Sequence, residues 1–196
     1  MLPVMNIAIR TLRQAGEYLQ QNIERQEFLL DDADNLRDRI NHIEKNLHKI
    51  VLQNLKRAYN DHYIADLGES GLEDKEVAWK FIPVHNPIAL TRGLPGNAMS
   101  LVCLHKGKVE HAAILHPSTG DEYTASRGRG AAINDKRIRV GKITHLSNAM
   151  LASNILEAGR HKDNNHVYRD LHNELSSATL PLYSSGCSTL DLAYTA

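Results

Sequence analysis

The chain carries, before its midpoint, the stretch Trp79-Lys80-Phe81-Ile82-Pro83-Val84-His85-Asn86-Pro87. Residues 77–84 are rich in apolar and aromatic side chains and predict a β-strand. Pro87 has no N–H to donate, but its fixed backbone angle suits the first turn of a helix. The stretch therefore predicts a strand that passes through a short turn into a helix.

Two amphipathic helices are predicted ahead of this stretch. Apolar residues recur at helical spacing from Pro3 to about Glu24 and, more strongly, from Asp34 to Tyr59. The second helix is expected to begin after the acidic residues Asp31 and Asp32, which favour a helix N-terminus. A coiled-coil arm is the alternative for this helix, although three heptads are the minimum for one.

A series of short strands is predicted around and after the quoted stretch. They cover residues 63–65, 77–84, 98–104, 109–115 and 122–125, and a last short hairpin lies between Gly128-Arg129-Gly130 and Asn134-Asp135-Lys136. The expected fold is an α+β domain in which two long helices pack on an antiparallel sheet.

The pattern changes near Leu146. Residues 150–155 and 180–183 are strand-like, residues 168–175 are helix-like, and residues 188–196 predict a helix that opens at Ser188 as its cap. We expect domain 1–145 followed by a partial α/β domain, 146–196. One helix cannot complete an α/β unit, because its sheet would keep an open edge and an uncovered face, so we expect the second domain to be truncated.

Composition excludes some classes of protein. The 23 basic and 23 acidic residues cancel, so no overall field recruits nucleic acid in general. No apolar run approaches the roughly 20 residues that span a bilayer, and no export signal is expected. Cys103 and Cys187 are expected to be reduced, which suits the cytoplasm.

Blocks of sequence in a fixed order resemble the inositol monophosphatase family and, within it, the bacterial SuhB branch. The quoted stretch aligns with the family pattern W-x-I-D-P-L-D-G-T. The other blocks are Leu94-Pro95 with Ala98-Met99-Ser100, Arg127-Gly128-Arg129-Gly130-Ala131, and Gly186-Cys187-Ser188-Thr189-Leu190-Asp191-Leu192-Ala193-Tyr194. The resemblance implies the family's layered fold and a homodimer, and it covers the N-terminal larger part of family members.

The resemblance also implies where a magnesium site would lie. In the family, ligands come from an E-E-S turn, from both aspartates of the quoted pattern and from a later W-D motif. In this chain Gly68, Ile82 and His85 stand at three of those positions, with Glu69 beside the first. Isoleucine offers no ligand atom, and histidine suits softer metals than magnesium.

Other positions of the family pocket also carry residues that differ from the family pattern. Glu44 stands where the family has an upstream Asp, and Val84 offers a backbone carbonyl. Asn86 and Pro87 replace the Gly and Thr whose backbone N–H groups cradle phosphate, and proline lacks that N–H. We expect a remnant pocket with no magnesium cofactor and no catalytic residue.

The resemblance implies a regulatory or scaffold role, in transcription antitermination with RNA polymerase and Nus factors. The expected partner surface is a basic hairpin, with a solvated edge as the alternative; its residues are Arg127, Arg129, Arg137 and Arg139. A second hypothesis is a magnesium-dependent inositol-1-monophosphatase with a rebuilt metal site from Glu44, Glu69 and His85. A third is a decayed gene product without a stable role.

Other residues carry weaker hypotheses. His85 is a zinc ligand or, more simply, a loop histidine. His105, His111 and His116 form a cluster or are separate satisfied histidines, since their spacing matches no standard metal motif. Asp66 and Glu69 bind a cation weakly or form a solvated acidic turn.

Overall fold

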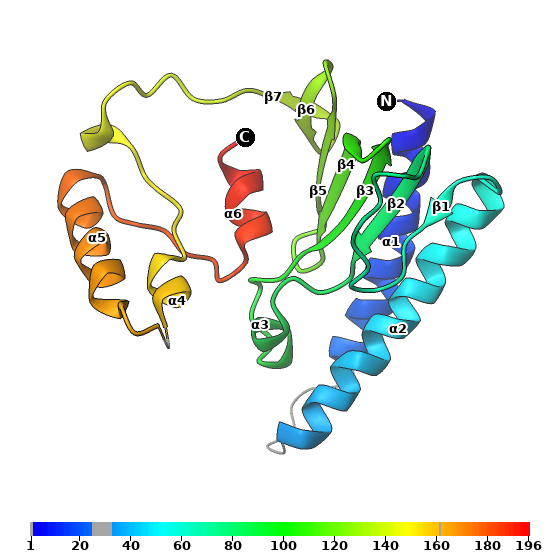
Figure 1. Ribbon diagram of the computed structural model, residues 1–196, viewed down its shortest axis with the longest axis horizontal. Coiled ribbons are helices and arrows are strands. Elements are labelled where there is room, and N and C mark those ends of the chain that lie inside the picture. The colour runs from blue at the N-terminus through cyan, green and yellow to red at the C-terminus, as the bar shows by residue number, and fades with distance from the viewer. Residues whose placement is uncertain (1, 25–32, 161) are drawn as a thin grey trace. The chain divides into compact units, whose positions relative to one another are not determined.

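The computed structural model in Figure 1 describes residues 2–24, 33–160 and 162–196. The chain divides into two compact units, Met1–Arg139 and Val140–Ala196. The domain limits predicted from the sequence, 1–145 and 146–196, stay a prediction. Each unit has its own helices, and the first unit contains the sheet.

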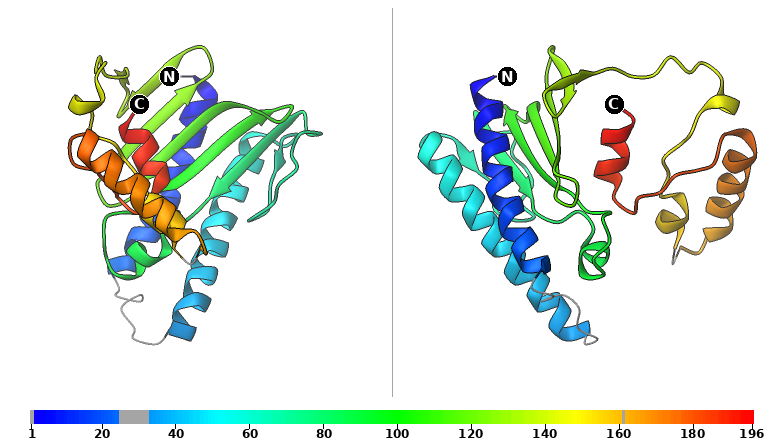
Figure 2. Two further views of the ribbon diagram at one scale, coloured as in Figure 1. Left: turned by 60° about the vertical axis from the view of Figure 1, so that its left-hand side comes forward. Right: turned by 180° about the vertical axis from the view of Figure 1, so that it is seen from behind.

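Two long helices open the first unit, α1 (Pro3–Glu24) and α2 (Ala33–Ala58), and both were predicted. The acidic residues Asp31 and Asp32 lie outside the described residues. Helix α2 buries Ile43, Leu47, Val51 and Leu55 in the same core as α1, so it is a core helix and not a coiled-coil arm. Figure 2 shows the two helices side by side on one face of the sheet.

The sheet follows chain order from β1 to β7. Its strands are β1 (Tyr63–Ile64), β2 (Val77–Ile82), β3 (Met99–His105), β4 (Lys108–His116), β5 (Asp121–Ser126), β6 (Gly130–Ile133) and β7 (Lys136–Ile138). Helix α3 (Pro87–Thr91) lies between β2 and β3.

The α+β fold class is confirmed, with one difference in the sheet. Strand β1 pairs in parallel with β2, whereas the pairings from β2 through β7 are antiparallel. The loop of residues 65–76 brings the chain back to the same end of the sheet before β2 begins, which a tight hairpin cannot do. The sheet is therefore mixed.

The core forms where the helices cover β2 to β4. Side chains on this face follow the two-residue period of a strand, and Trp79, Leu101 and Ala113 are each no more than 1% exposed. Helix α1 approaches the sheet closely at Gly16, where an added Cβ would lie 2.6 Å from Leu115 Cδ2. The buried Trp79 indole N–H donates to His62 Nδ1 at 3.0 Å, which satisfies its polar atom.

The second unit contains η1 (Leu146–Asn148), α4 (Ile155–Gly159), α5 (Asn165–Ala178) and α6 (Ser188–Tyr194). The strands predicted at 150–155 and 180–183 are wrong. These segments meet in an isolated parallel bridge between Ala152 and Tyr183, and Ile155 already begins α4. An apolar run of this length does not by itself distinguish a strand from a short helix.

The two remaining helix predictions for this unit are confirmed, but the predicted Ser cap of α6 is wrong. The N-cap is Cys187, and it makes no side-chain capping bond. The hydroxyl of Ser188 instead accepts a hydrogen bond from Asn154 Nδ2 at 2.9 Å. A serine at a helix start was therefore not enough to identify the cap.

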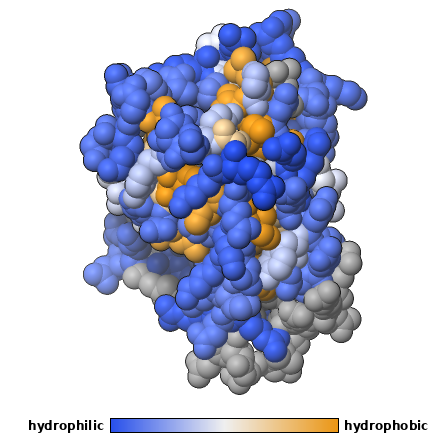
Figure 3. Space-filling view, turned by 90° about the vertical axis from the view of Figure 1, so that its right-hand side faces the viewer, coloured by the Kyte–Doolittle hydropathy of each residue, from blue (hydrophilic) through white to orange (hydrophobic). Residues whose placement is uncertain are grey.

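On the face shown in Figure 3, hydrophilic residues cover most of the surface and hydrophobic residues show between them. Within the described ranges, no helix combines the length and apolar character that crossing a bilayer requires. Helices α1 and α2, the long ones, are amphipathic.

Candidate functional site

The residues predicted for a remnant pocket include the turn that joins β2 to α3. Ile82 ends the strand, and Pro83 and Val84 are buried directly after it. Asn86 is the N-cap of α3, and its side-chain oxygen accepts from the Ala89 N–H at 3.0 Å. Pro87 then occupies the first helical turn, as its sequence position predicts.

A second asparagine, Asn97, holds this turn closed. Its side-chain oxygen accepts from the His85 N–H at 3.1 Å and from the Asn86 N–H at 3.0 Å. Asn97 is only 3% exposed, and the two residues that donate to it are half-buried. Since Pro87 has no N–H, the turn offers few backbone donors for a bound phosphate.

His85 is engaged on its side chain as well. Its Nε2 lies 2.7 Å from Ser100 Oγ on β3. Burial lowers the pKa of His85, so the ring is held in its neutral form. Ile82 is the register partner of Ser100, so an aliphatic side chain and a hydrogen-bonded histidine lie next to each other at this end of β2 and β3.

The Gly68–Glu69 turn is folded onto its own neighbours. Gly68 has a φ of 78°, a left-handed value that favours glycine. The two Glu69 carboxylate oxygens accept from the Tyr63 hydroxyl at 2.7 Å and from the Asp66 N–H at 2.8 Å. These bonds, the one from Tyr63 foremost, lower the pKa of Glu69. The carboxylate therefore accepts hydrogen bonds within its own loop. These contacts favour an acidic turn over a cation site.

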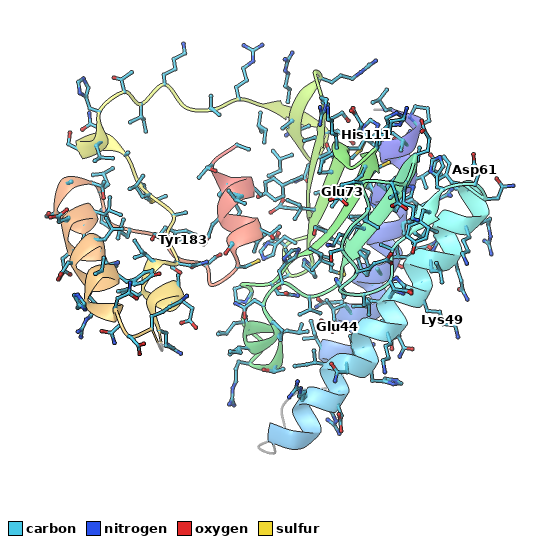
Figure 4. The ribbon with its side chains drawn as sticks, in the orientation of Figure 1. Glu44, Lys49, Asp61, Glu73, His111 and Tyr183 are labelled. Atoms are coloured by element: carbon cyan, nitrogen blue, oxygen red, sulfur yellow. The ribbon has the colours of Figure 1, made fainter. Side chains whose placement is uncertain are left out.

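Glu44 projects from α2, where Figure 4 labels it. Burial raises the pKa of Glu44, because taking a carboxylate out of water disfavours its charged form. A magnesium ligand has to be ionised, so this environment works against metal binding.

These residues do not fit magnesium. Across residues 2–24, 33–160 and 162–196, no three His, Cys, Asp or Glu side chains gather in a group that could hold a metal ion. Magnesium needs several hard oxygen ligands in near-octahedral geometry. Of the predicted positions, Ile82 has no ligand atom, His85 Nε2 lies against Ser100 Oγ, and the Glu69 carboxylate, in a separate loop, is already hydrogen-bonded.

The three histidines of the β3–β4 region have separate partners. His111 Nδ1 lies 2.9 Å from Ser126 Oγ, His116 Nδ1 lies 2.7 Å from Thr119 Oγ1, and His105 Nε2 lies 3.5 Å from Glu76. These contacts favour three separate histidines, each with its own partner, over a histidine cluster.

The basic hairpin consists of arginines with different surroundings. Arg127 Nη2 donates to the Val109 carbonyl at 2.7 Å, and its Nε lies 3.3 Å from Glu110 Oε1. These contacts tie Arg127 to the neighbouring strand β4. Arg129, Arg137 and Arg139 are exposed.

Sequence reasoning missed Asn97 and Tyr63. Asn97 lies between the Leu94-Pro95 block and a buried strand, but no spacing rule connects it to N–H groups 11 and 12 residues earlier. Tyr63 is six residues from Glu69, and only the loop geometry brings its hydroxyl to the carboxylate.

Comparison with known proteins agrees with this architecture. The Nus factor SuhB of Pseudomonas aeruginosa is 33% identical over 202 residues, which cover 100% of this chain and 74% of that protein. The Nus factor SuhB of Escherichia coli is 27% identical over 198 residues, covering 100% of this chain and 73% of that protein.

Solved structures show the same fold. The suhB extragenic suppressor protein of Bartonella henselae superposes with a TM-score of 0.81 at 22% identity, over 99% of this chain and 74% of that one. An inositol monophosphatase from Anabaena gives 0.77 at 23% identity, over 97% and 68%. The family model described as inositol monophosphatase family matches residues 1–196, and the chain belongs to that family.

Proposed function

We propose that this protein is a catalytically inactive member of the inositol monophosphatase family with a regulatory or scaffold role. Its proposed setting is transcription antitermination in the cytoplasm, with RNA polymerase and Nus factors as partners and a homodimer as its working form. The observation that carries the proposal is the turn at residues 82–87, where an aliphatic residue, a hydrogen-bonded histidine and a proline replace ligand and phosphate-binding groups.

The free energy that metal-binding carboxylates contribute to catalysis supports the proposed lack of phosphatase activity. A carboxylate that holds a catalytic metal contributes several kcal/mol of transition-state stabilisation through that ion. Even a loss of about 3 kcal/mol for one group lowers a rate more than a hundredfold. With Gly68, Ile82 and His85 at three ligand positions, the losses compound.

The partner setting is supported by relatives whose names include Nus factor. The proposed partner surface is the exposed part of the basic hairpin, at Arg129, Arg137 and Arg139. Arg127 has a structural role there, because its guanidinium binds the Val109 carbonyl.

The test is a binding measurement with purified Pseudomonas aeruginosa core RNA polymerase and NusA, made by size-exclusion chromatography and biolayer interferometry. We expect a complex that Arg129→Glu with Arg139→Glu weakens. The exposed pair Arg57→Glu with Arg92→Glu is the matched control, with the same charge change elsewhere on the first unit. A chain that binds neither protein would contradict the scaffold role.

The second candidate is an inositol-1-monophosphatase, favoured by the match to the inositol monophosphatase family over residues 1–196. It requires a metal site rebuilt from Glu44, Glu69 and His85. Magnesium-dependent release of phosphate from inositol-1-phosphate by the purified chain, abolished by Glu44→Gln, would favour it over the scaffold role.

A further inference from the structure

The helix-facing side of the sheet changes character between β4 and β7. Across neighbouring strands Ala113 pairs with Thr124, Thr124 with Ala132, and Ala132 with Arg137. These residues share one face because paired residues point to the same side of a sheet. This face is apolar and buried under the helices at β2 to β4. Toward β7 its side chains are small or polar.

A hollow of about 370 Å³ lies at this end of the first unit. The start of α1 forms one wall, and β5, β6, β7 and their turns form the rest. Its lining residues are Leu2, Met5, Thr124, Ala125, Ser126, Arg129, Gly130, Ala131, Ala132, Asp135 and Arg137. The small residues of β6 give the hollow its depth, and a volume of this size is in the range of ligand sites.

The charged residues of the lining are two arginines and one aspartate, so its net formal charge is positive. Among residues 2–24, 33–160 and 162–196, the side chains of Arg129 and Arg137 make no hydrogen bond or ion pair, in contrast to Arg127, which is bonded to β4. The N-terminal end of the 22-residue helix α1 adds its partial positive charge.

The geometry of Arg137 and Gly130 brings a guanidinium into the hollow. A Cβ on Gly130 would lie 3.7 Å from both Nε and Nη2 of Arg137, so this guanidinium lies over the bare glycine backbone. Gly130 also has a φ of 83°, which disfavours other residues. Ser126, in register with Gly130, supplies a hydroxyl that is held at 2.9 Å from His111 Nδ1.

We propose that this hollow binds a phosphate group. Guanidinium groups match phosphate geometry through paired N–H donors, and the hydroxyls of Thr124 and Ser126 can donate to further phosphate oxygens. Its described lining contains no aromatic side chain, so it has no platform on which a base could stack. The inference gives the proposed partner surface a ligand chemistry, and to that extent it rests on the proposed function.

The phosphate can belong to a free nucleotide or to the backbone of single-stranded RNA, and one assay separates these sources. Fluorescein-labelled octauridylate is titrated with the full chain at low salt, and AMP and inorganic phosphate are added as competitors. We expect Arg129→Ala with Arg137→Ala to weaken probe binding about tenfold or more, since charge-assisted bonds to phosphate are lost. Displacement by AMP identifies a nucleotide site, and resistance to AMP identifies the RNA backbone.

The control pair Arg57→Ala with Arg92→Ala removes the same charge elsewhere and is expected to retain at least half of the parental affinity. A second comparison, Ala132→Glu against Ala132→Gln, adds equal bulk to the hollow and differs in charge; the Glu variant is expected to bind at least fivefold more weakly. Equal losses in the two arginine pairs, equal affinities of the two Ala132 variants, or no binding by the parent chain would overturn the proposal. The assay contains no polymerase, so its failure leaves the scaffold role to its own test.

Discussion

Strand β2 and the turn that follows it differ in how their residues contribute to the protein. Within β2, Trp79 and Phe81 are buried against the helices, and the indole N–H has its partner in His62. A few residues later, His85 and Asn86 are held by Asn97, and their hydrogen bonds close the turn on itself. The strand builds the core, whereas the polar groups of the turn are satisfied by partners outside it, Asn97 and Ser100.

This difference would allow the family fold to persist if the ligand set is lost, as we propose. Burial of the apolar face at β2 to β4 stabilises the unit regardless of what stands at residues 82 and 85. The half-buried N–H groups of the turn need acceptors, and the Asn97 side chain supplies one. Fold and chemistry therefore rest on different residues of the same segment.

The largest expected effect comes from the strand. Trp79→Ala is expected to cost about 3–5 kcal/mol of unfolding free energy, because it opens a cavity in the packed core. Urea unfolding followed by circular dichroism measures this loss. The control is Ile88→Ala, because Ile88 is 76% exposed. Its unfolding free energy is expected to stay within about 0.5 kcal/mol of the parent value. Similar losses for both variants would mean that β2 is not the centre of the core.

The next effect tests the turn. Asn97→Ala is expected to cost about 1–3 kcal/mol, because it removes the side-chain oxygen that accepts from the half-buried His85 and Asn86 N–H groups. Asn97→Asp keeps that acceptor and is expected to lose less above pH 6. It also removes the Nδ2 that, within the described ranges, is buried without a hydrogen-bond partner. An alanine variant as stable as the parent would show that the turn does not depend on Asn97.

A smaller effect is expected from His85. Burial holds the pKa of His85 below its ordinary value of 6.5, so the unfolded chain takes up the proton first as pH falls. The stability that His85 contributes is complete above pH 6.5 and is lost as pH falls through the folded-state pKa. Unfolding free energies of the parent between pH 7.5 and 5 should fall more steeply than those of His85→Gln. His166→Gln, which removes an exposed histidine, should follow the parent, and three superimposable curves would contradict the account.

The smallest effect concerns the exposed loop. Tyr63→Phe removes the hydroxyl that donates to Glu69, so the pKa of Glu69 is expected to rise. Because that pKa is lowered in the folded protein, the contribution of Glu69 to stability is present at neutral pH and is lost as pH falls through its folded-state value. NMR titration of the Glu69 carboxyl carbon measures the change. An unchanged pKa would mean that Tyr63 does not hold the carboxylate.

Much of the first unit could be predicted from its sequence, because long helices and period-two strands leave regular apolar patterns. The second unit was harder: residues 150–155 and 180–183 have strand-like composition but meet in an isolated bridge. At the site, the substitutions at Ile82, His85 and Pro87 are visible in the sequence. The contacts that fill the turn depend on partners such as Asn97 and Ser100, which the fold brings close and no local spacing encodes.

The most direct test of the account is magnesium binding by the purified chain. Isothermal titration calorimetry with MgCl₂, in the presence of inositol-1-phosphate, is run beside an active inositol monophosphatase under the same conditions, and phosphate release is measured in parallel. The account predicts a binding isotherm for the active enzyme and neither saturable magnesium binding nor phosphate release for this chain. Saturable binding with turnover, lost on His85→Ala or Glu69→Gln, would show that these residues still hold a catalytic cation and would contradict the central claim.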